Sequence, residues 1–243
     1  MKKDNSTSGT DKIKQEFSWD NVTNELSAAS GLERKDFMID EIFTLDCYEH
    51  IYPVKDGDIV LDLGGSIGPF TWKIMDKASK VYTVEPMIDL IPTIEKNTKG
   101  FPVTIINAAL DHTCGEIEFT DTCINEFEEK KVKTIDFKTL LSENNIEKID
   151  FIKTDCEGGE YALINDINLP WIKENVRNIV GEWHLDMTDG TNWKIDFRYF
   201  RDKFLPQFKS FEVYSIDNVD IKWDLYNEHF IEYYNQVIFH IEV

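Results

Sequence analysis

The sequence predicts an α/β fold, a Rossmann-like doubly wound sheet of seven strands that is mostly parallel, with the last strand antiparallel. Two features of the chain indicate this fold. Short apolar runs alternate with segments of helical pattern through its middle, which is the order typical of βαβ units. A loop with three glycines follows the first apolar run, 59–63, and the chain ends in two consecutive strand-like runs, 208–216 and 236–241.

The expected elements follow from periodicity and from glycine and proline positions. Strands of the main sheet are expected at 59–63, 81–84, 103–106, 150–154, from 179 onward, 208–216 and 236–241. Helices are expected at 11–50, 69–78, 89–98, 137–144 and 197–204. The alternating run 115–120 predicts a half-exposed strand, with 132–134 beside it or extending the sheet and 126–131 as a charged loop.

The 243 residues are enough for one domain of this kind with an N-terminal extension. We expect a flexible tail at 1–10, a helical extension at 11–56 and the α/β domain at 57–243. The tail has positive charge but no apolar segment after it, so it does not resemble a secretory signal. We expect a cytoplasmic protein, because four cysteines without paired spacing suit a reducing compartment.

Composition disfavours several classes of partner. The formal charge is -20, from 46 acidic against 26 basic residues, and such a field repels phosphate backbones, so no nucleic acid partner is expected. No apolar run reaches about 18 residues, so no membrane span is expected. The four cysteines show no paired spacing and predict free thiols. His112, Cys114 and Cys123 lack a fourth ligand, so no zinc site is expected.

The loop after the first strand has the pattern Asp-x-Gly-x-x-x-Gly, with Asp62 before Gly64, Gly65, Ser66 and Gly68. Glycines allow a ligand to approach the backbone closely. The pattern is neither a dinucleotide fingerprint nor a P-loop, and a carboxylate beside a phosphate would be repulsive. Asp62 instead suits a cationic ligand such as S-adenosylmethionine, which carries an ammonium and a sulfonium. The alternative is an ordinary glycine-rich turn in which Asp62 caps a helix.

A second acid supports a nucleoside ligand. Glu85 ends the strand 81–84, about 20 residues after the first glycine, which is the spacing at which a carboxylate binds a ribose hydroxyl. A third group of acids follows the strand 150–154, where Asp155, Glu157 and Glu160 surround Gly158-Gly159. Asp155 is expected on the same rim as Asp62 and Glu85, while Glu160 is better explained as complementing a helix dipole.

Three stretches resemble the FkbM family of methyltransferases, a branch of the class I S-adenosylmethionine-dependent enzymes. They are Val60–Gly68, Val132–Asp136 and, most distinctively, Ile149–Glu160 with its Lys-x-Asp-x-Glu-Gly-x-Glu pattern. The run Ile179–His184 resembles the end of that family's fifth strand. The resemblance covers about 57–184. The sequence departs from the family pattern at Gly65-Ser66, where Ala-Asn is common in the family. The glycines on either side of the loop, Gly64 and Gly68, are kept.

The resemblance implies roles on the cofactor side. Gly64, Gly65, Ser66 and Gly68 would hold the methionyl part of S-adenosylmethionine, with Asp62 near its amino group. Glu85 would bind the ribose diol, and Met87, Ala108 and Ala109 would flank the adenine. Asp155 would face the methyl group that is transferred.

On the acceptor side, the candidate catalytic residues are Asp155, Glu182 and His184. Glu182 and His184 lie two apart on a strand end, hence on one face, and a histidine suits proton transfer near neutrality. His184 is equally explained as a loop histidine without a catalytic role. Asp155, Glu157, Glu182 and His184 would alternatively gather a divalent metal such as Mg²⁺, which orients an acceptor diol.

FkbM-like enzymes typically methylate hydroxyls, so the expected activity is O-methylation of a sugar, glycan or small natural product. The alternatives are N-methylation of an amine or protein side chain, which the acidic charge favours, and a cofactor-binding scaffold without catalysis. The expected partner is a small-molecule or saccharide acceptor. The sequence is also compatible with a homo-oligomer. The C-terminal part is rich in aromatic residues, which could stack on a sugar, with Trp223 on an exposed loop as the best candidate. Such residues more often belong to the core or to a subunit interface.

Overall fold

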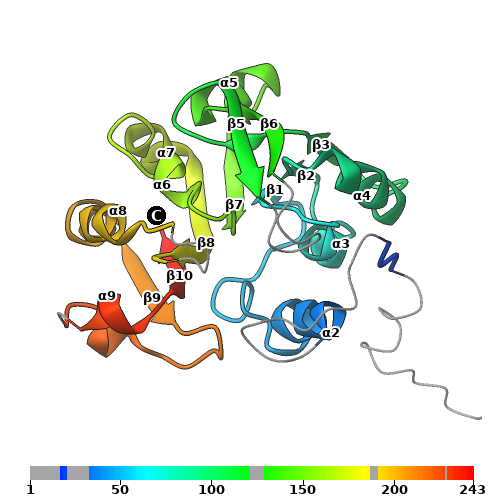
Figure 1. The fold of residues 1–243 in the computed structure, drawn as a ribbon. Coiled ribbons are helices and arrows are strands. Elements are labelled where there is room, and N and C mark those ends of the chain that lie inside the picture. Colours follow the sequence, from blue (N-terminus) through cyan, green and yellow to red (C-terminus); the bar gives the residue numbers. More distant parts are fainter. Residues whose placement is uncertain (1–16, 21–32, 121–128, 187–190, 228) are drawn as a thin grey trace, which may run out of the picture.

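The computed structural model describes residues 17–20, 33–120, 129–186, 191–227 and 229–243. Its centre is a seven-stranded sheet in the order β3-β2-β1-β7-β8-β10-β9 (Figure 1). The strands are β1 (Ile59–Leu63), β2 (Lys80–Val84), β3 (Val103–Ile106), β7 (Ile149–Thr154), β8 (Val176–His184), β9 (Ser210–Tyr214) and β10 (Gln236–Glu242). Strand β10 runs opposite to the other six strands of this sheet, antiparallel to both β8 and β9. The predicted doubly wound sheet with an antiparallel last strand is confirmed.

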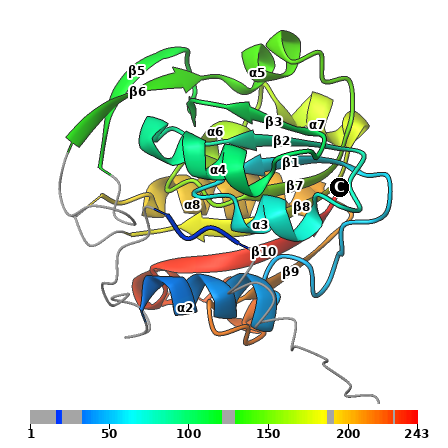
Figure 2. The ribbon, with the colours of Figure 1, turned by 90° about the vertical axis from the view of Figure 1, so that its right-hand side faces the viewer.

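Helices cover both faces of this sheet, because successive strand residues point to opposite sides. On one face, Val60 and Phe151 pack against helix α3 (Pro69–Ile74). Helix α4 (Ile91–Asn97), preceded by a 3₁₀ turn at Ile88–Leu90, lies on this side as well (Figure 2). On the other face, Leu61 and Ile152 belong to the larger core. That core is covered by α5 (Phe137–Glu143), α6 (Glu160–Leu163), α7 (Leu169–Asn175) and α8 (Lys194–Tyr199).

A second, three-stranded sheet has the order β4-β6-β5, with β4 at Ala109–Leu110, β5 at Gly115–Thr120 and β6 at Glu129–Ile135. The predicted pairing of 132–134 with 115–120 is confirmed. The predicted charged loop at 126–131 is wrong for 129–131, which belong to β6, while 126–128 lie outside the described residues. Opposite charges face each other across β5 and β6, namely Glu116 with Lys133 and Glu118 with Lys131. These cross-strand pairs stabilise β6 over a longer range than the predicted 132–134.

The N-terminal segment is helical over a shorter range than the predicted 11–50. Helix α2 spans Arg34–Ile39 and continues as a π-helical turn at Asp40–Thr44. The helix ends there because Asp46 adopts a positive φ of 55°, which a right-handed helix does not allow. Ile42 packs in the same core as α3, and Lys73 of α3 donates a hydrogen bond to the Ile42 carbonyl. Residues 11–16 and 21–32 of the predicted helix lie outside the described part.

Other predicted boundaries differ by a few residues. Helix α3 ends at Ile74 rather than 78, β8 begins at Val176 rather than 179, and the predicted helix 197–204 is α8 followed by a π-helical turn at Phe200–Phe204. The helix α7, a short helix α9 (Phe230–Tyr233) and 3₁₀ turns at Leu205–Gln207 and Lys222–Asp224 were not predicted. Of the helices in the described part of the chain, none has both the length and the apolar character that a membrane span requires.

Candidate active site

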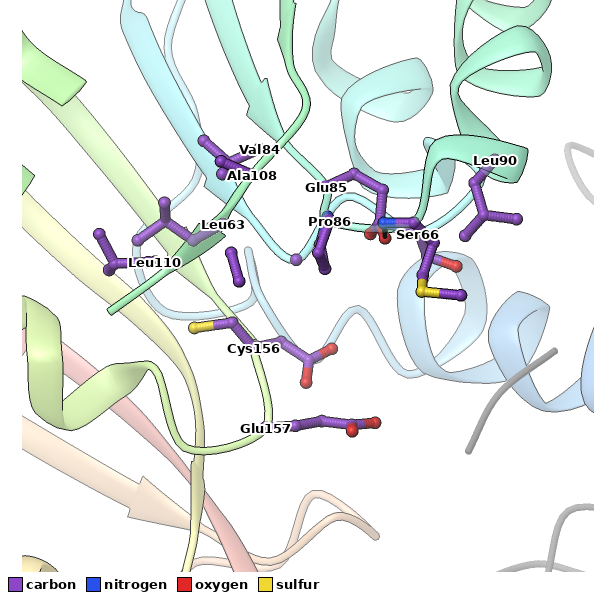
Figure 3. Close-up of a pocket in the computed structure, with 14 residues that line it drawn as sticks. Leu63, Ser66, Val84, Glu85, Pro86, Leu90, Ala108, Leu110, Cys156 and Glu157 are labelled. Carbon is purple, nitrogen blue, oxygen red and sulfur yellow. Dashed lines mark hydrogen bonds between the residues drawn. The ribbon is translucent and has the colours of Figure 1, made fainter. Parts of the chain in front are cut away.

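The site lies where the strand order reverses, between β1 and β7, at the carboxyl ends of the strands. A pocket opens there between the loops that follow β1, β2, β3 and β7 (Figure 3). About 690 Å³ of space lies between these loops, part of it open to solvent. Its lining consists of Leu63, Gly64, Ser66, Val84, Glu85, Pro86, Met87, Leu90, Ala108, Ala109, Leu110, Asp155, Cys156 and Glu157.

The glycine loop forms one wall of the pocket. A Cβ on Gly64, whose φ is 78°, would lie 1.7 Å from the carbonyl oxygen of Asp155, so only glycine lets the ends of β1 and β7 approach this closely. A Cβ on Gly65 would lie 2.3 Å from Cγ2 of Thr83. Gly64 and Ser66 line the pocket, whereas Gly65 and Gly68 shape the loop from outside the lining.

The carboxylate of Glu85 connects the glycine loop to the segment after β2. Its Oε2 accepts a hydrogen bond from the backbone N–H of Ser66 at 2.7 Å, and its Oε1 accepts one from the N–H of Met87 at 2.8 Å. Figure 3 shows Glu85 and Ser66 side by side in the lining. Each carboxylate oxygen has a further lone pair, so the acid can accept hydroxyl hydrogens while it keeps both backbone contacts.

Apolar residues complete the wall opposite the glycine loop. Met87, Ala108 and Ala109, expected around a base, do line the pocket. Sequence reasoning missed the other apolar lining residues, Leu63, Val84, Pro86, Leu90 and Leu110. Leu63, Val84 and Pro86 lie at or just beyond the ends of β1 and β2, which is the signal that would have identified them, whereas Leu90 and Leu110 lie farther along the chain.

Asp62 lies behind the loop rather than in the pocket. Its side chain is fully buried, and Oδ2 accepts a hydrogen bond from the Thr71 hydroxyl at 2.6 Å. Burial raises the pKa of this carboxyl, and nearby Lys153 acts in the opposite direction. Asp62, expected near the amino group of the cofactor, is not among the residues that line the pocket.

Lys153, which sequence reasoning did not place in the site, links Asp62 to the pocket. Its Nζ donates a hydrogen bond of 2.7 Å to the carbonyl oxygen of Gly64. The same Nζ lies 3.5 Å from Oδ1 of Asp62 and 3.6 Å from Oδ2 of Asp155. Burial alone would lower the pKa of this amine, but the surrounding carboxylates raise it above its usual value, so Lys153 stays charged. The lysine in the Lys-x-Asp pattern was the available signal.

Asp155, Glu182 and His184 come together as predicted for one rim. The Nε2 of His184 lies 4.0 Å from Oδ1 of Asp155 and 3.6 Å from Oε2 of Glu182. On its other side, His184 Nδ1 lies 3.3 Å from Oε1 of Glu160. Burial by itself would lower the pKa of His184, but the charge of Glu160 and of Asp155 raises it to about 9.

Glu160, the first residue of α6, is fixed by the backbone of the loop before it. Its two carboxylate oxygens accept hydrogen bonds from the N–H groups of Cys156 and Gly158, each at 2.9 Å. The same acid holds His184, which sequence reasoning did not foresee. Trp193 packs against Gly158, where its ring atoms would be 2.4 Å from an added Cβ, and its ring centroid is 6.3 Å from that of His184.

The N-terminal segment adds two side chains to the rim. The hydroxyl of Tyr48 donates a hydrogen bond to Oε1 of Glu41 at 2.6 Å and lies 3.2 Å from Oδ2 of Asp155. Glu41 in turn shares a hydrogen bond with Glu182, and burial together with the charges of Asp155 and Glu41 raises the pKa of Glu182 well above its usual value. Sequence reasoning missed both residues because the contacts span more than 100 positions in the chain. Trp223 is 80% exposed and lies outside the pocket lining.

The methyltransferase FkbM domain, as a family model, matches residues 62–215. This chain belongs to the FkbM methyltransferase family, so it is an S-adenosylmethionine-dependent methyltransferase with S-adenosylmethionine as the family's cofactor. The match begins at Asp62 and includes the pocket's glycine loop and the Lys153–Glu160 pattern, as the motifs predicted.

Solved structures are similar to this chain at low sequence identity. Phosphoethanolamine N-methyltransferase 1 of Haemonchus contortus, solved with phosphoethanolamine and S-adenosylhomocysteine, is 12% identical with a TM-score of 0.50, over 86% of this chain and 43% of that one. A precorrin 8w decarboxylase of Methanobacterium thermoautotrophicum is 15% identical with a TM-score of 0.46, over 94% and 97%. The fibrillarin/Nop5p complex is 14% identical with a TM-score of 0.47, over 80% and 76%. No curated protein sequence matches this chain.

Proposed function

We propose that this methyltransferase acts on a hydroxyl group of a sugar, a glycan or a small natural product. The observation that carries the proposal is the position of Asp155. Its carboxylate lines the cofactor pocket and at the same time belongs to the group formed with His184 and Glu182. A proton acceptor at the boundary between cofactor and acceptor is what a hydroxyl nucleophile needs, because a hydroxyl loses its proton when it is methylated.

The pocket fits the cofactor through its chemistry and shape. Glu85 would bind the ribose hydroxyls, the apolar residues Met87, Ala108 and Ala109 would flank the adenine, and the loop Gly64–Gly68 would hold the methionyl part. Asp62 and Lys153 act behind the loop, since the lysine holds the Gly64 carbonyl. When bound, S-adenosylmethionine supplies a methyl group that its sulfonium has already activated.

The residues of the rim align the acceptor and take its proton. Asp155 is the proposed proton acceptor, because it is the member of the group that both faces the pocket and has an exposed side-chain fraction, 30%. Nε2 of His184 lies 4.0 Å from Asp155 and 3.6 Å from Glu182, and Glu160 holds the other side of the ring, so these side chains form one ordered group. Alignment of donor and acceptor then provides much of the rate enhancement.

An amine acceptor is the second candidate. The carboxylates of Glu41, Asp155 and Glu182 gather at the rim, and the formal charge of the chain is -20. Such a field attracts cationic molecules, including amines and lysine side chains. Methylation of an amine differs from methylation of a hydroxyl in that it needs no strong base, because a neutral amine is already nucleophilic.

The test is a panel of acceptors in matched pairs, each a hydroxyl compound and its amino analogue, incubated with isotopically labelled S-adenosylmethionine. The proposal predicts label on oxygen, identified by NMR of the product, and a loss of at least a hundredfold in kcat for Asp155→Asn. Label on nitrogen, with Asp155→Asn retaining activity, would favour the amine acceptor instead. Glu174→Gln, on the exposed side of α7, serves as the control variant.

A further inference from the structure

Three side chains of the rim point one ligand atom each toward a common space. The ligand atoms of Asp155, Glu182 and His184 all lie within 4.8 Å of one another. The distances from His184 Nε2, 3.6 Å to Glu182 and 4.0 Å to Asp155, are too long for hydrogen bonds. They match the spacing of neighbouring ligands around a cation with bonds of about 2.0–2.2 Å, for which the separations are roughly 3–4 Å.

His184 is presented as metal-bound histidines are. Its side chain is only 7% exposed, and within the described part of the chain Nε2 makes no hydrogen bond, although the atom is directed between two carboxylates. The other ring nitrogen, Nδ1, is held by Glu160. A carboxylate on the far nitrogen fixes the ring orientation and the tautomer that leaves Nε2 available to a cation. Glu160 is itself fixed by two backbone N–H groups.

The charge around this space is negative in excess. Four acids face it or lie directly behind it, namely Glu41, Asp155, Glu160 and Glu182. Their partners in the described part of the chain include the buried amine of Lys153 and the imidazole of His184. Oε2 of Glu182 also accepts a hydrogen bond from the amide of Gln236 at 2.8 Å. Buried carboxylates are stable only when they are paired, protonated or bound to a metal. A dication would offset the excess more completely than a protonated imidazole does.

We propose that Asp155, Glu182 and His184 bind a divalent transition-metal ion that holds the acceptor hydroxyl next to the cofactor pocket. One imidazole nitrogen with two carboxylate oxygens suits Mn²⁺ better than Mg²⁺, which prefers oxygen ligands alone. Three protein ligands leave coordination positions open for an acceptor. The inference rests on the proposed function: the ion lowers the pKa of the bound hydroxyl, and Asp155, bound to the ion through one carboxylate oxygen, accepts the proton with the other.

The position of Asp155 gives the ion a place in the reaction. Asp155 lines the cofactor pocket with a side chain that is 30% exposed, whereas Glu182 and His184 lie deeper at 6% and 7%. The open positions of the ion would therefore face the pocket. An acceptor with two adjacent hydroxyls, as in a sugar, would occupy two of them and present one oxygen to the methyl donor.

The direct test is titration of the full chain with Mn²⁺, monitored by the loss of the EPR signal of the free hydrated ion. The structure predicts one site per chain with a Kd below about 100 μM for Mn²⁺. Binding of Mg²⁺ should be at least about tenfold weaker, because one ligand is an imidazole nitrogen and Mg²⁺ prefers oxygen. His184→Gln and Glu182→Gln should each weaken Mn²⁺ binding by at least tenfold. His112→Gln and Glu174→Gln make the same chemical changes at exposed positions and should bind Mn²⁺ as the unaltered chain does.

The outcomes separate this inference from the proposed function. Binding of S-adenosylhomocysteine is measured in parallel by calorimetry with EDTA present, and circular dichroism verifies that each variant is folded. If the unaltered chain binds the nucleoside but takes up no Mn²⁺ below 1 mM, the metal site is refuted and the methyltransferase site stands. Equal Mn²⁺ binding by His184→Gln and the unaltered chain would also refute it. Failure to bind the nucleoside would instead refute the proposed cofactor pocket.

Discussion

The buried amine of Lys153 donates a hydrogen bond to the carbonyl oxygen of Gly64 at 2.7 Å, and so joins the end of β7 to the glycine loop after β1. The same amine lies within 3.6 Å of carboxylate oxygens on Asp62 and Asp155. One cation thus sets the shape of the loop and compensates the charge of an acid that lines the pocket.

Replacing Lys153 by methionine should therefore destabilise the fold and weaken cofactor binding together. Removal of one partner from a buried ion pair costs about 3–5 kcal/mol, because the carboxylates are left without compensation. We expect the free energy of unfolding in urea to fall by that amount and the Kd for S-adenosylhomocysteine to rise at least tenfold. Lys148→Met, at an exposed lysine beside Asp150, is the control. Unchanged affinity in Lys153→Met would contradict the role given to this contact.

Gly65 and Thr83 are expected to be energetically coupled. A Cβ at residue 65 would lie 2.3 Å from Cγ2 of Thr83, so Gly65→Ala should cost about 1–3 kcal/mol, as overpacking does. Thr83→Ser removes that methyl group and keeps the hydroxyl that is paired with Thr71. Urea unfolding of both single variants and the double variant should give a favourable coupling of about 1 kcal/mol or more. Additive effects would show that the methyl group does not restrict this position.

Ser66 adopts a left-handed backbone conformation, with a φ of 50°. Asparagine tolerates this conformation better than most residues, whereas a β-branched side chain does not. Ser66→Asn should therefore leave the melting temperature unchanged or raise it slightly, and Ser66→Val should cost about 1–2 kcal/mol. Both variants keep the backbone N–H that Glu85 accepts. A Ser66→Val variant as stable as the unaltered chain would exclude this backbone conformation.

The two backbone contacts of Glu85 make it sensitive even to an isosteric change. Glutamine has one acceptor oxygen, so Glu85→Gln would leave the N–H of either Ser66 or Met87 facing an amide donor. An unsatisfied buried group costs about 1–3 kcal/mol, so we expect at least a tenfold loss of S-adenosylhomocysteine affinity in calorimetry. Glu95→Gln, on the exposed side of α4, should bind normally. If Glu85→Gln and the unaltered chain bound S-adenosylhomocysteine with equal affinity, the ribose would not lie at Glu85.

His240 should make the protein sensitive to mild acid. Burial, and secondarily the neighbouring His50, lower the pKa of His240 to about 3. An unfolded histidine titrates near 6.5, so between about pH 6.5 and pH 3 the unfolded chain binds a proton that the folded one does not. Its contribution is complete above pH 6.5 and is lost as the pH falls, by up to about 1.4 kcal/mol per pH unit.

The measurement is the stability difference between the unaltered chain and His240→Phe at several pH values. Subtraction cancels the carboxyl groups that titrate in both proteins. The advantage of the unaltered chain should shrink steadily from pH 6.5 to pH 4.5. A difference that does not vary with pH would show that His240 is solvated or protonated in the folded state.

Much of the sheet was predictable because its signals are local. The strands Ile59–Leu63 and Val103–Ile106 are short apolar runs bounded by glycine, proline or polar residues, and their bounds were predicted to the residue. The seven-strand topology followed from the order of such runs. The helices were less predictable, because breaks such as the one at Asp46 depend on a single backbone conformation.

The site was predictable only in part, for a physical reason. Glu85 and Asp155 follow strand ends, and the carboxyl ends of parallel strands must meet at one edge. The buried position of Asp62, by contrast, depends on the path of the loop beside it. Glu41 and Tyr48 reach the rim through packing of the N-terminal segment, which no spacing in the sequence encodes.

The measurement that tests the central claim most directly is a crystal structure of the full chain with S-adenosylhomocysteine. The account predicts that the ribose hydroxyls contact Glu85, that the adenine lies among Met87, Ala108 and Ala109, and that the sulfur faces Asp155. A nucleoside bound away from Glu85, or one whose sulfur is directed away from Asp155, would contradict the assignment of both the cofactor pocket and the acceptor side.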